Sequence, residues 1–164
     1  MKNELNHFDP GGKAVMVDVS AKDVTTRTAT ATGCITMNGA AFAAVAAGTA
    51  EKGDVLGVAR VAGIMAAKRT AELIPMCHPL VTEKATVDFE LLPESRTVRA
   101  TCTVKTSGKT GVEMEALCGV NIALLTVYDM CKAVDRAMTL HAICLMEKQG
   151  GKSGHYRRED TPND

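Results

Sequence analysis

Residues 82–107, TEKATVDFELLPESRTVRATCTVKTS, contain the two strands and the turn around which the fold is organised. The runs 82–92 and 97–107 are both strand-like, rich in threonine and valine. Between them, Pro93-Glu94-Ser95-Arg96 is a short polar join that contains a proline, as is typical of a tight turn. We therefore predict an antiparallel hairpin.

Two further strands are expected on either side of this hairpin. Upstream, 25–37 (TTRTATATGCITM) alternates threonine with small or apolar residues, which suits a half-buried strand. Downstream, 139–147 is the last strand-like run.

Helices are predicted between these strands. The alanine-rich run 40–47 ends at Gly48, a common C-cap residue, and Asp54 is placed to cap a longer helix that continues to about residue 73. Pro75 stops that helix. A third helix is expected over 112–138.

The order strand, helices, hairpin, helix, strand predicts an α+β fold of ferredoxin-like type, a mostly antiparallel sheet with helices packed on one face. We expect a single catalytic domain, 1–164, with mobile tails at 1–12 and 155–164. The stretch 117–127 is apolar on nearly every side of its helix, and one small sheet covers only one side. Another subunit is therefore expected to cover the rest.

Composition argues against several classes of partner. The formal net charge is zero, and the only aromatic residues are three Phe and two Tyr. Neither nucleic acid nor an acidic membrane is attracted by such a balance, and base-stacking surfaces are not expected. The most apolar segment, 116–127, is shorter than the about 20 residues that span a bilayer. We expect a cytoplasmic protein without a secretory signal or membrane attachment.

The cysteines give no sign of a metal or redox site. None of the six has C-x-x-C spacing, and most lie among apolar neighbours, so they are interpreted as small core residues. Cys77 is kept apart because it adjoins His78. No protein-held metal is expected.

Two loop clusters are candidates for substrate contact. Lys52, beside Gly53 at the start of a helix, is either a solvated lysine or an anion-binding group. In Met76-Cys77-His78, the histidine lies between two prolines on a stiff backbone and is either structural or placed for substrate contact or proton transfer.

Two clusters on the helix over 112–138 are further candidates. Glu113-Met114-Glu115 either caps the helix electrostatically or binds the guanidine-like donors of a purine or pterin ring. Asp129 and Lys132 are three residues apart and share a helix face. Because that helix is expected to be buried, we interpret the pair as an acid–base pair. The Gly-Lys-Thr and Gly-Lys-Ser segments at 108–110 and 151–153 lack the earlier glycine of a nucleotide-triphosphatase loop.

Taken together, these segments resemble the family of cyclic pyranopterin monophosphate synthases, which act in molybdenum-cofactor biosynthesis. The resemblance covers 15–154, and Met76 is a mild variant where leucine is familiar. The segments that carry it, in order, are 16–20 (MVDVS), 52–55 (KGDV), 66–70 (AAKRT), 73–80 (LIPMCHPL), 110–117 (TGVEMEAL), 128–133 (YDMCKA) and 150–154 (GGKSG).

The resemblance implies a lyase that converts 3′,8-cyclo-7,8-dihydroguanosine triphosphate into cyclic pyranopterin monophosphate and pyrophosphate. It implies Asp129 and Lys132 as the acid–base pair, assisted by Lys52 and His78, with substrate contacts from Met76, Cys77, Met114 and Glu115. It also implies a homohexamer, a trimer of dimers with sites at the dimer interface, and an upstream radical enzyme as supplier.

Phosphate chemistry adds expectations about charge. Lys52, Lys68, Lys132, Lys148 and Lys152 are available to neutralise the charge of a leaving pyrophosphate. No cofactor is expected except Mg²⁺ that accompanies the substrate phosphates. The alternative is a non-catalytic carrier of a pterin or nucleotide, which needs no paired acid and base.

Overall fold

The computed structural model describes residues 11–152 and 154–159, and its core is a five-stranded sheet with the order β2-β3-β1-β4-β5. All neighbouring strands run antiparallel. The strands are β1 (Thr25–Thr36), β2 (Lys84–Leu92), β3 (Thr97–Gly108), β4 (Thr139–Gln149) and β5 (Tyr156–Arg157), and the helices are α1 (Gly39–Ala47), α2 (Val55–Lys68), α3 (Thr70–Leu73) and α4 (Glu113–Cys131). The order of β2, β3, β1 and β4 is that of a ferredoxin-like fold, as predicted.

The predicted hairpin and the predicted first strand are confirmed. β2 and β3 pair from Lys84 with Lys105 to Leu92 with Thr97, so the turn is the expected 93–96. Along β1, small and apolar residues such as Ala29 and Ala31 are fully buried while the threonines between them are half-exposed. This alternation puts one face of the sheet in the core.

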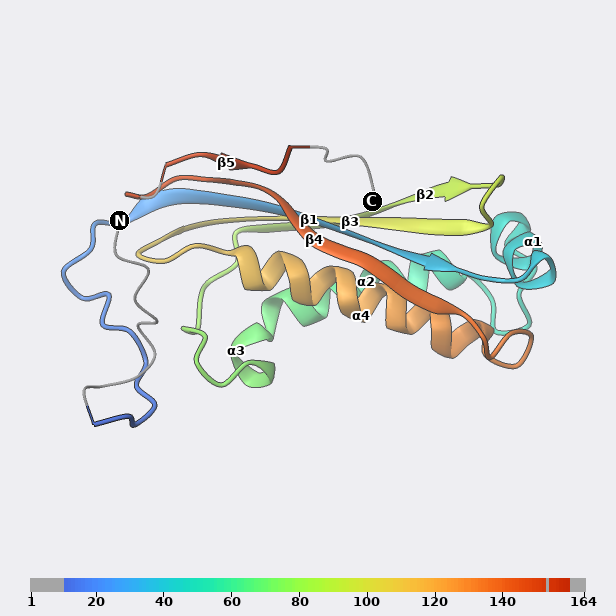
Figure 1. Ribbon diagram of the computed structural model, residues 1–164, viewed down its shortest axis with the longest axis horizontal. Helices are drawn as coiled ribbons and strands as arrows, with labels where there is room; N and C mark the ends of the chain where they lie inside the picture. The colour runs from blue at the N-terminus through green and yellow to red at the C-terminus, as the bar shows by residue number, and fades with distance from the viewer. Residues whose placement is uncertain (1–10, 153, 160–164) are drawn as a thin grey trace.

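α2 and α4 lie side by side on that face of the sheet, and α1 lies at its end (Figure 1). α2 and α4 can approach so closely because they cross at glycines. A Cβ placed on Gly63 would be 2.8 Å from the Gly119 carbonyl oxygen. The small residues of α2 therefore serve helix packing.

Helix ends are where the expectations fail. The helix predicted from Asp54 to about residue 73 breaks at Arg69 into α2 and α3, because the Thr70 hydroxyl donates to the carbonyls of Ala66 and Ala67. Asp54 does cap it, accepting from Gly57 N at 2.8 Å, and Gly48 caps α1 in the left-handed conformation.

The helix predicted over 112–138 ends at Cys131, earlier than expected. The Asp135 carboxylate accepts from the backbone N–H groups of Asn38 and Ala137, at 2.7 and 2.9 Å, and this closes a turn after the helix. At the other end of β4, the tail expected to be mobile over 155–164 contains β5, whose residues pair with Glu147 and Lys148. Residues 1–10 and 160–164, also expected in mobile tails, lie outside the described residues.

α4 is covered by the sheet and by α2, but the outer side of the helix layer is bare in the single chain. Val58, Val61 and Met65 of α2 and Leu125 of α4 are exposed there, Val61 by 58%. α4 is also the only described helix with the length and apolar composition of a membrane span. Since it packs against the sheet through fully buried residues such as Val120 and Leu124, it is the core helix of this fold.

Candidate active site

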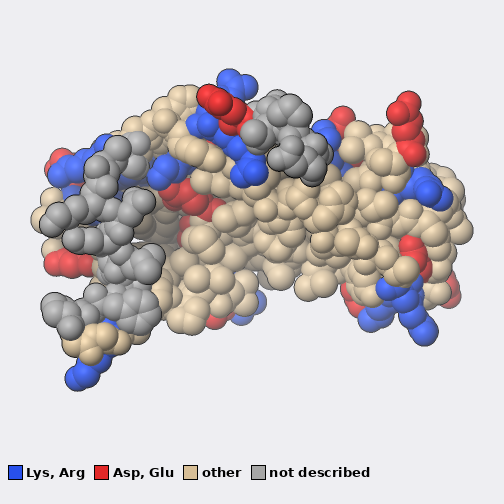
Figure 2. Space-filling model, viewed as in Figure 1, with Lys and Arg blue, Asp and Glu red and all other residues tan. Residues whose placement is uncertain are grey.

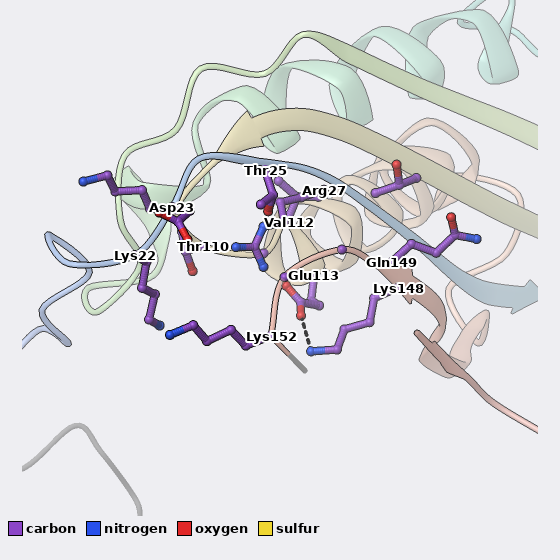
Figure 3. Close-up of a pocket in the computed structure, with 15 residues that line it drawn as sticks. Lys22, Asp23, Thr25, Arg27, Thr110, Val112, Glu113, Lys148, Gln149 and Lys152 are labelled. Atoms are coloured by element: carbon purple, nitrogen blue, oxygen red, sulfur yellow. Dashed lines mark ion pairs between the residues drawn. The ribbon is translucent and has the colours of Figure 1, made fainter. Parts of the chain in front are cut away.

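A basic pocket of about 540 Å³ opens where the first residues of β1, the loop before α4 and the end of β4 meet. Lysine and arginine side chains gather around a hollow on this side of the molecule (Figure 2). Its lining combines cations from separate segments with the polar groups beside them: Lys22, Thr25, Arg27, Lys109, Glu113, Lys148 and Lys152 (Figure 3). Five cations and two acidic residues, Asp23 and Glu113, line the pocket, so its net charge is positive and favours an anion.

Arg27 is the least expected member of this pocket. It shares the inward face of β1 with Ala29 and Ala31, and its residue is only 9% exposed. Its Nε is buried and has no hydrogen-bond partner among the described residues, and the same holds for Thr25 Oγ1. A buried unpaired donor costs about 1–3 kcal/mol, and a ligand that accepted a hydrogen bond from it would offset that cost. Arg27 was not among the predicted site residues, although a charged residue in phase with small apolar ones along a strand is a signal for such a position.

The lysines of the pocket differ in their partners. Lys148 forms a 2.8 Å ion pair with Glu113, and Lys109 donates to the Ser20 carbonyl at 2.6 Å. Lys152 reaches the pocket from the loop after β4, close to Lys22 in the view of Figure 3. Of the lysines considered for phosphate, Lys148 and Lys152 therefore line this pocket. Lys68 instead lines a separate cavity of about 130 Å³.

A second pocket, of about 290 Å³, adjoins the first and contains most of the predicted substrate contacts. Lys22, Thr110, Gly111 and Glu113 line both pockets. The predicted contacts that line the second pocket are Met76, Cys77, His78, Glu113, Met114 and Glu115. The structure thus brings together a loop and a helix start that are far apart in the sequence.

His78 is held by the N-terminal segment. Its Nε2 lies 2.8 Å from the carbonyl oxygen of Val17. Because a carbonyl only accepts, Nε2 carries the proton, and in the neutral ring Nδ1 is then the acceptor. The imidazole can therefore accept a proton from a ligand through one defined atom.

Glu115 is a buried carboxyl that lines the second pocket and is 4% exposed. Burial raises the pKa of this carboxyl above its usual value, and the nearby Glu113 charge raises it further, whereas a backbone hydrogen bond lowers it. Burial also raises the pKa of the Cys77 thiol, and the charge of Glu115 adds to that rise. Cys77 is therefore not an activated thiolate.

Asp129, Lys132 and Lys52 form a separate charged cluster at the far end of α4. Lys132 Nζ donates to Asp129 Oδ1 at 2.7 Å, and Lys52 Nζ donates to the Asp129 backbone carbonyl at 3.1 Å and lies 3.6 Å from Oδ2. The hydrogen bond from Lys132, followed by the charges of Lys132 and Lys52, lowers the pKa of Asp129. Lys52 comes from the loop between α1 and α2, and its place beside this pair was implied only by the family resemblance, not by its spacing in the sequence.

The expected burial of the pair is wrong for the single chain. The side chains of Asp129 and Lys132 are 59% and 53% exposed, because α4 turns this face away from both the sheet and α2. Within one chain, the charged cluster and the second pocket also remain apart. α4 runs without interruption from Glu113 to Cys131, so Glu115 and Asp129 are separated by about 21 Å along its axis.

Among residues 11–152 and 154–159, no group of three or more His, Cys, Asp or Glu side chains is arranged to hold a metal ion. The adjoining pockets and the charged cluster thus define a class of protein: a ferredoxin-like α+β enzyme that binds an anionic small molecule and carries groups for proton transfer.

Comparison with known proteins identifies the family. A model described as the MoaC family matches residues 16–151, and the chain belongs to this family. Cyclic pyranopterin monophosphate synthase of Clostridium botulinum (strain Alaska E43 / Type E3) is 58% identical over 159 residues, covering 97% of this chain and 100% of the relative. Cyclic pyranopterin monophosphate synthase of Desulfitobacterium hafniense (strain DSM 10664 / DCB-2) is 57% identical over 157 residues, covering 96% of each chain.

Proposed function

We propose that this protein is a cyclic pyranopterin monophosphate synthase, a lyase of molybdenum-cofactor biosynthesis. Its substrate is 3′,8-cyclo-7,8-dihydroguanosine triphosphate, and its products are cyclic pyranopterin monophosphate and pyrophosphate. The observation that carries this proposal is the continuity of the two pockets, one cationic and one lined by Met114 and Glu115. That arrangement matches a substrate with a triphosphate at one end and a purine-derived ring at the other.

The triphosphate occupies the basic pocket. Arg27 offers an unpaired Nε–H there, and Lys148 and Lys152 add charge from the end of β4. Cations held in this way stabilise the negative charge that develops as pyrophosphate leaves. Mg²⁺, where it takes part, arrives with the substrate phosphates and neutralises them further.

The ring occupies the second pocket. The buried Glu115 carboxyl lines this pocket, where it accepts a hydrogen bond from a ring N–H group when ionised or donates one to a ring nitrogen when protonated. His78 faces the same space with Nδ1 available as a proton acceptor. Methionine and cysteine side chains complete an adaptable apolar wall.

Proton transfer is the work of Asp129, Lys132 and Lys52. Opening and re-closing a purine-derived ring needs several proton transfers, and a carboxylate hydrogen-bonded to an ammonium group provides an acceptor and a donor side by side. Since this cluster is about 21 Å from Glu115 along α4, we assign it to the site of a second subunit.

Assembly follows from the same separation. A two-fold dimer places the charged cluster of one subunit against the pockets of the other, and the reciprocal contact makes a second site. The exposed side chains of Val58, Val61, Met65 and Leu125 support further burial between subunits. We propose a homohexamer, a trimer of dimers, located in the cytoplasm and supplied by an upstream radical enzyme. Neither nucleic acid nor a membrane is a partner.

A non-catalytic carrier accounts less well for these features. A carrier needs the two pockets but has no use for the Asp129–Lys132 pair, which is held at 2.7 Å with Lys52 beside it. The enzyme is therefore the function that we adopt.

Turnover tests the proposal directly. Purified protein is incubated with 3′,8-cyclo-7,8-dihydroguanosine triphosphate, and pyrophosphate is measured together with the fluorescent pterin formed after oxidation. Equal amounts of both products are expected. Tight substrate binding without either product would favour the carrier.

A further inference from the structure

The guanidinium of Arg27 lies directly against the main chain of Gly151, in the loop that follows β4. Arg27 comes from β1 and reaches the middle of the basic pocket (Figure 3). Because its residue is only 9% exposed, the side chain has little room for other conformations. The orientation of the guanidinium therefore depends on the residue packed against it.

Gly151 is the residue behind it. A Cβ at this position would be 2.9 Å from Arg27 Nη2 and closer still to Cζ and Nη1. These atoms form the far end of a flexible side chain, so the clash would be relieved by moving the guanidinium and not by moving the fold. Neighbouring Gly150 differs in this respect, because a Cβ there would meet the backbone oxygen of Thr26.

We propose that Gly151 is a positioning residue: the absence of a side chain creates the niche that holds the Arg27 guanidinium toward the phosphates. The inference rests on the proposed location of the triphosphate in the basic pocket. In this role Gly151 acts on the substrate only through Arg27, without touching the substrate itself.

Gly154 offers a matched control in the same loop. Its φ of +69° is close to the +75° of Gly151, so alanine suffers the same left-handed backbone strain at either position. A Cβ at Gly154, however, would meet no heavy atom of the described residues within 4 Å. Of the two substitutions, only Gly151→Ala brings a Cβ against Arg27.

The test is calorimetric titration of the full-length protein with inorganic pyrophosphate, a probe that contains the leaving group alone. Gly151→Ala is expected to weaken binding roughly tenfold to a hundredfold, the effect of losing a charge-assisted hydrogen bond. Gly154→Ala is expected to bind like the unaltered protein. In the Arg27→Ala background, adding Gly151→Ala should cost no further affinity, because the two substitutions remove the same interaction.

Thermal unfolding of the same variants covers the case in which Gly151→Ala folds poorly. Gly151→Ala should then destabilise the protein less when Arg27 is already alanine, since the clash is absent. Normal pyrophosphate affinity in Gly151→Ala, equal losses in Gly154→Ala, or additive losses in the double variant would each overturn the inference. Normal affinity in Arg27→Ala alone would instead refute the location of the phosphates.

Discussion

Two inactive variants should restore each other's activity if each active site draws on two chains. His78→Ala damages the second pocket, and Asp129→Ala damages the charged cluster at the other end of α4. Because Glu115 and Asp129 are separated by about 21 Å along one unbroken helix, the two substitutions affect different sites of the same chain. Each subunit therefore still supplies one undamaged half.

The expected recovery follows from random pairing. When equal amounts of the two variants are mixed, about half of the dimers contain one of each, and each mixed dimer has one doubly damaged and one intact site. About a quarter of all sites are then intact, so activity should return to about a quarter of normal. Pyrophosphate release is measured after co-expression, with different affinity tags on the two variants so that mixed dimers are isolated and counted.

A matched pair from the same cluster provides the control. Asp129→Ala mixed with Lys132→Met should stay inactive, because every site in a mixed dimer receives one damaged cluster. If His78→Ala and Asp129→Ala stay as inactive as their parents while mixed dimers are present, the two residues serve the same site from one chain. That result would refute the shared site.

Three other outcomes are expected. Asp129→Asn and Lys132→Met should each abolish most turnover while thermal melting stays unchanged, because the pair is exposed; normal turnover in both would end their catalytic assignment. Light scattering at micromolar concentration should give about six times the chain mass. Met65→Glu, on the bare helix face, should lower that mass, and a stable monomer of the unaltered protein would contradict the hexamer. Burial raises the pKa of Glu115 above 4.5, so the folded state holds a proton that the unfolded state releases, and stability falls as the pH rises from 4.5 through the raised pKa. Glu115→Gln should escape that loss, so its melting temperature should rise relative to that of the unaltered protein as the pH increases toward neutral. A difference in melting temperature that does not change with pH would argue against a raised pKa of Glu115.

Local patterns were sufficient to predict most of the sheet. Threonine alternating with buried alanine defines β1, and the polar join at 93–96 defines the hairpin. Helix ends were predicted less well because they depend on side-chain hydrogen bonds that periodicity does not record. The Thr70 hydroxyl breaks one helix, and the Asp135 carboxylate ends another. β5 was overlooked because so short a strand exists only through its pairing with β4.

The candidate site was likewise predictable only in part from the sequence. The residues predicted at the two ends of α4 line the second pocket or form an ion pair, and their substrate-binding and catalytic roles stay predictions. Lys52 joins Asp129 only because the loop between α1 and α2 reaches the end of α4, and Arg27 enters the basic pocket only because β1 begins beside the end of β4. Such proximity depends on the tertiary fold, which no local pattern contains.

Because α4 is unbroken, residues cannot be inserted into it or deleted from it without changing the site. One codon inserted between Glu115 and Asp129 would lengthen the helix by about 1.5 Å and turn everything beyond it by about 100°. Any such insertion would turn Asp129 away from Lys52, and one placed before Gly119 would also turn Gly119 away from Gly63. Insertions and deletions should therefore be absent between these residues, whereas the surface turn at 93–96 lies away from both pockets and can vary in length without altering the reaction.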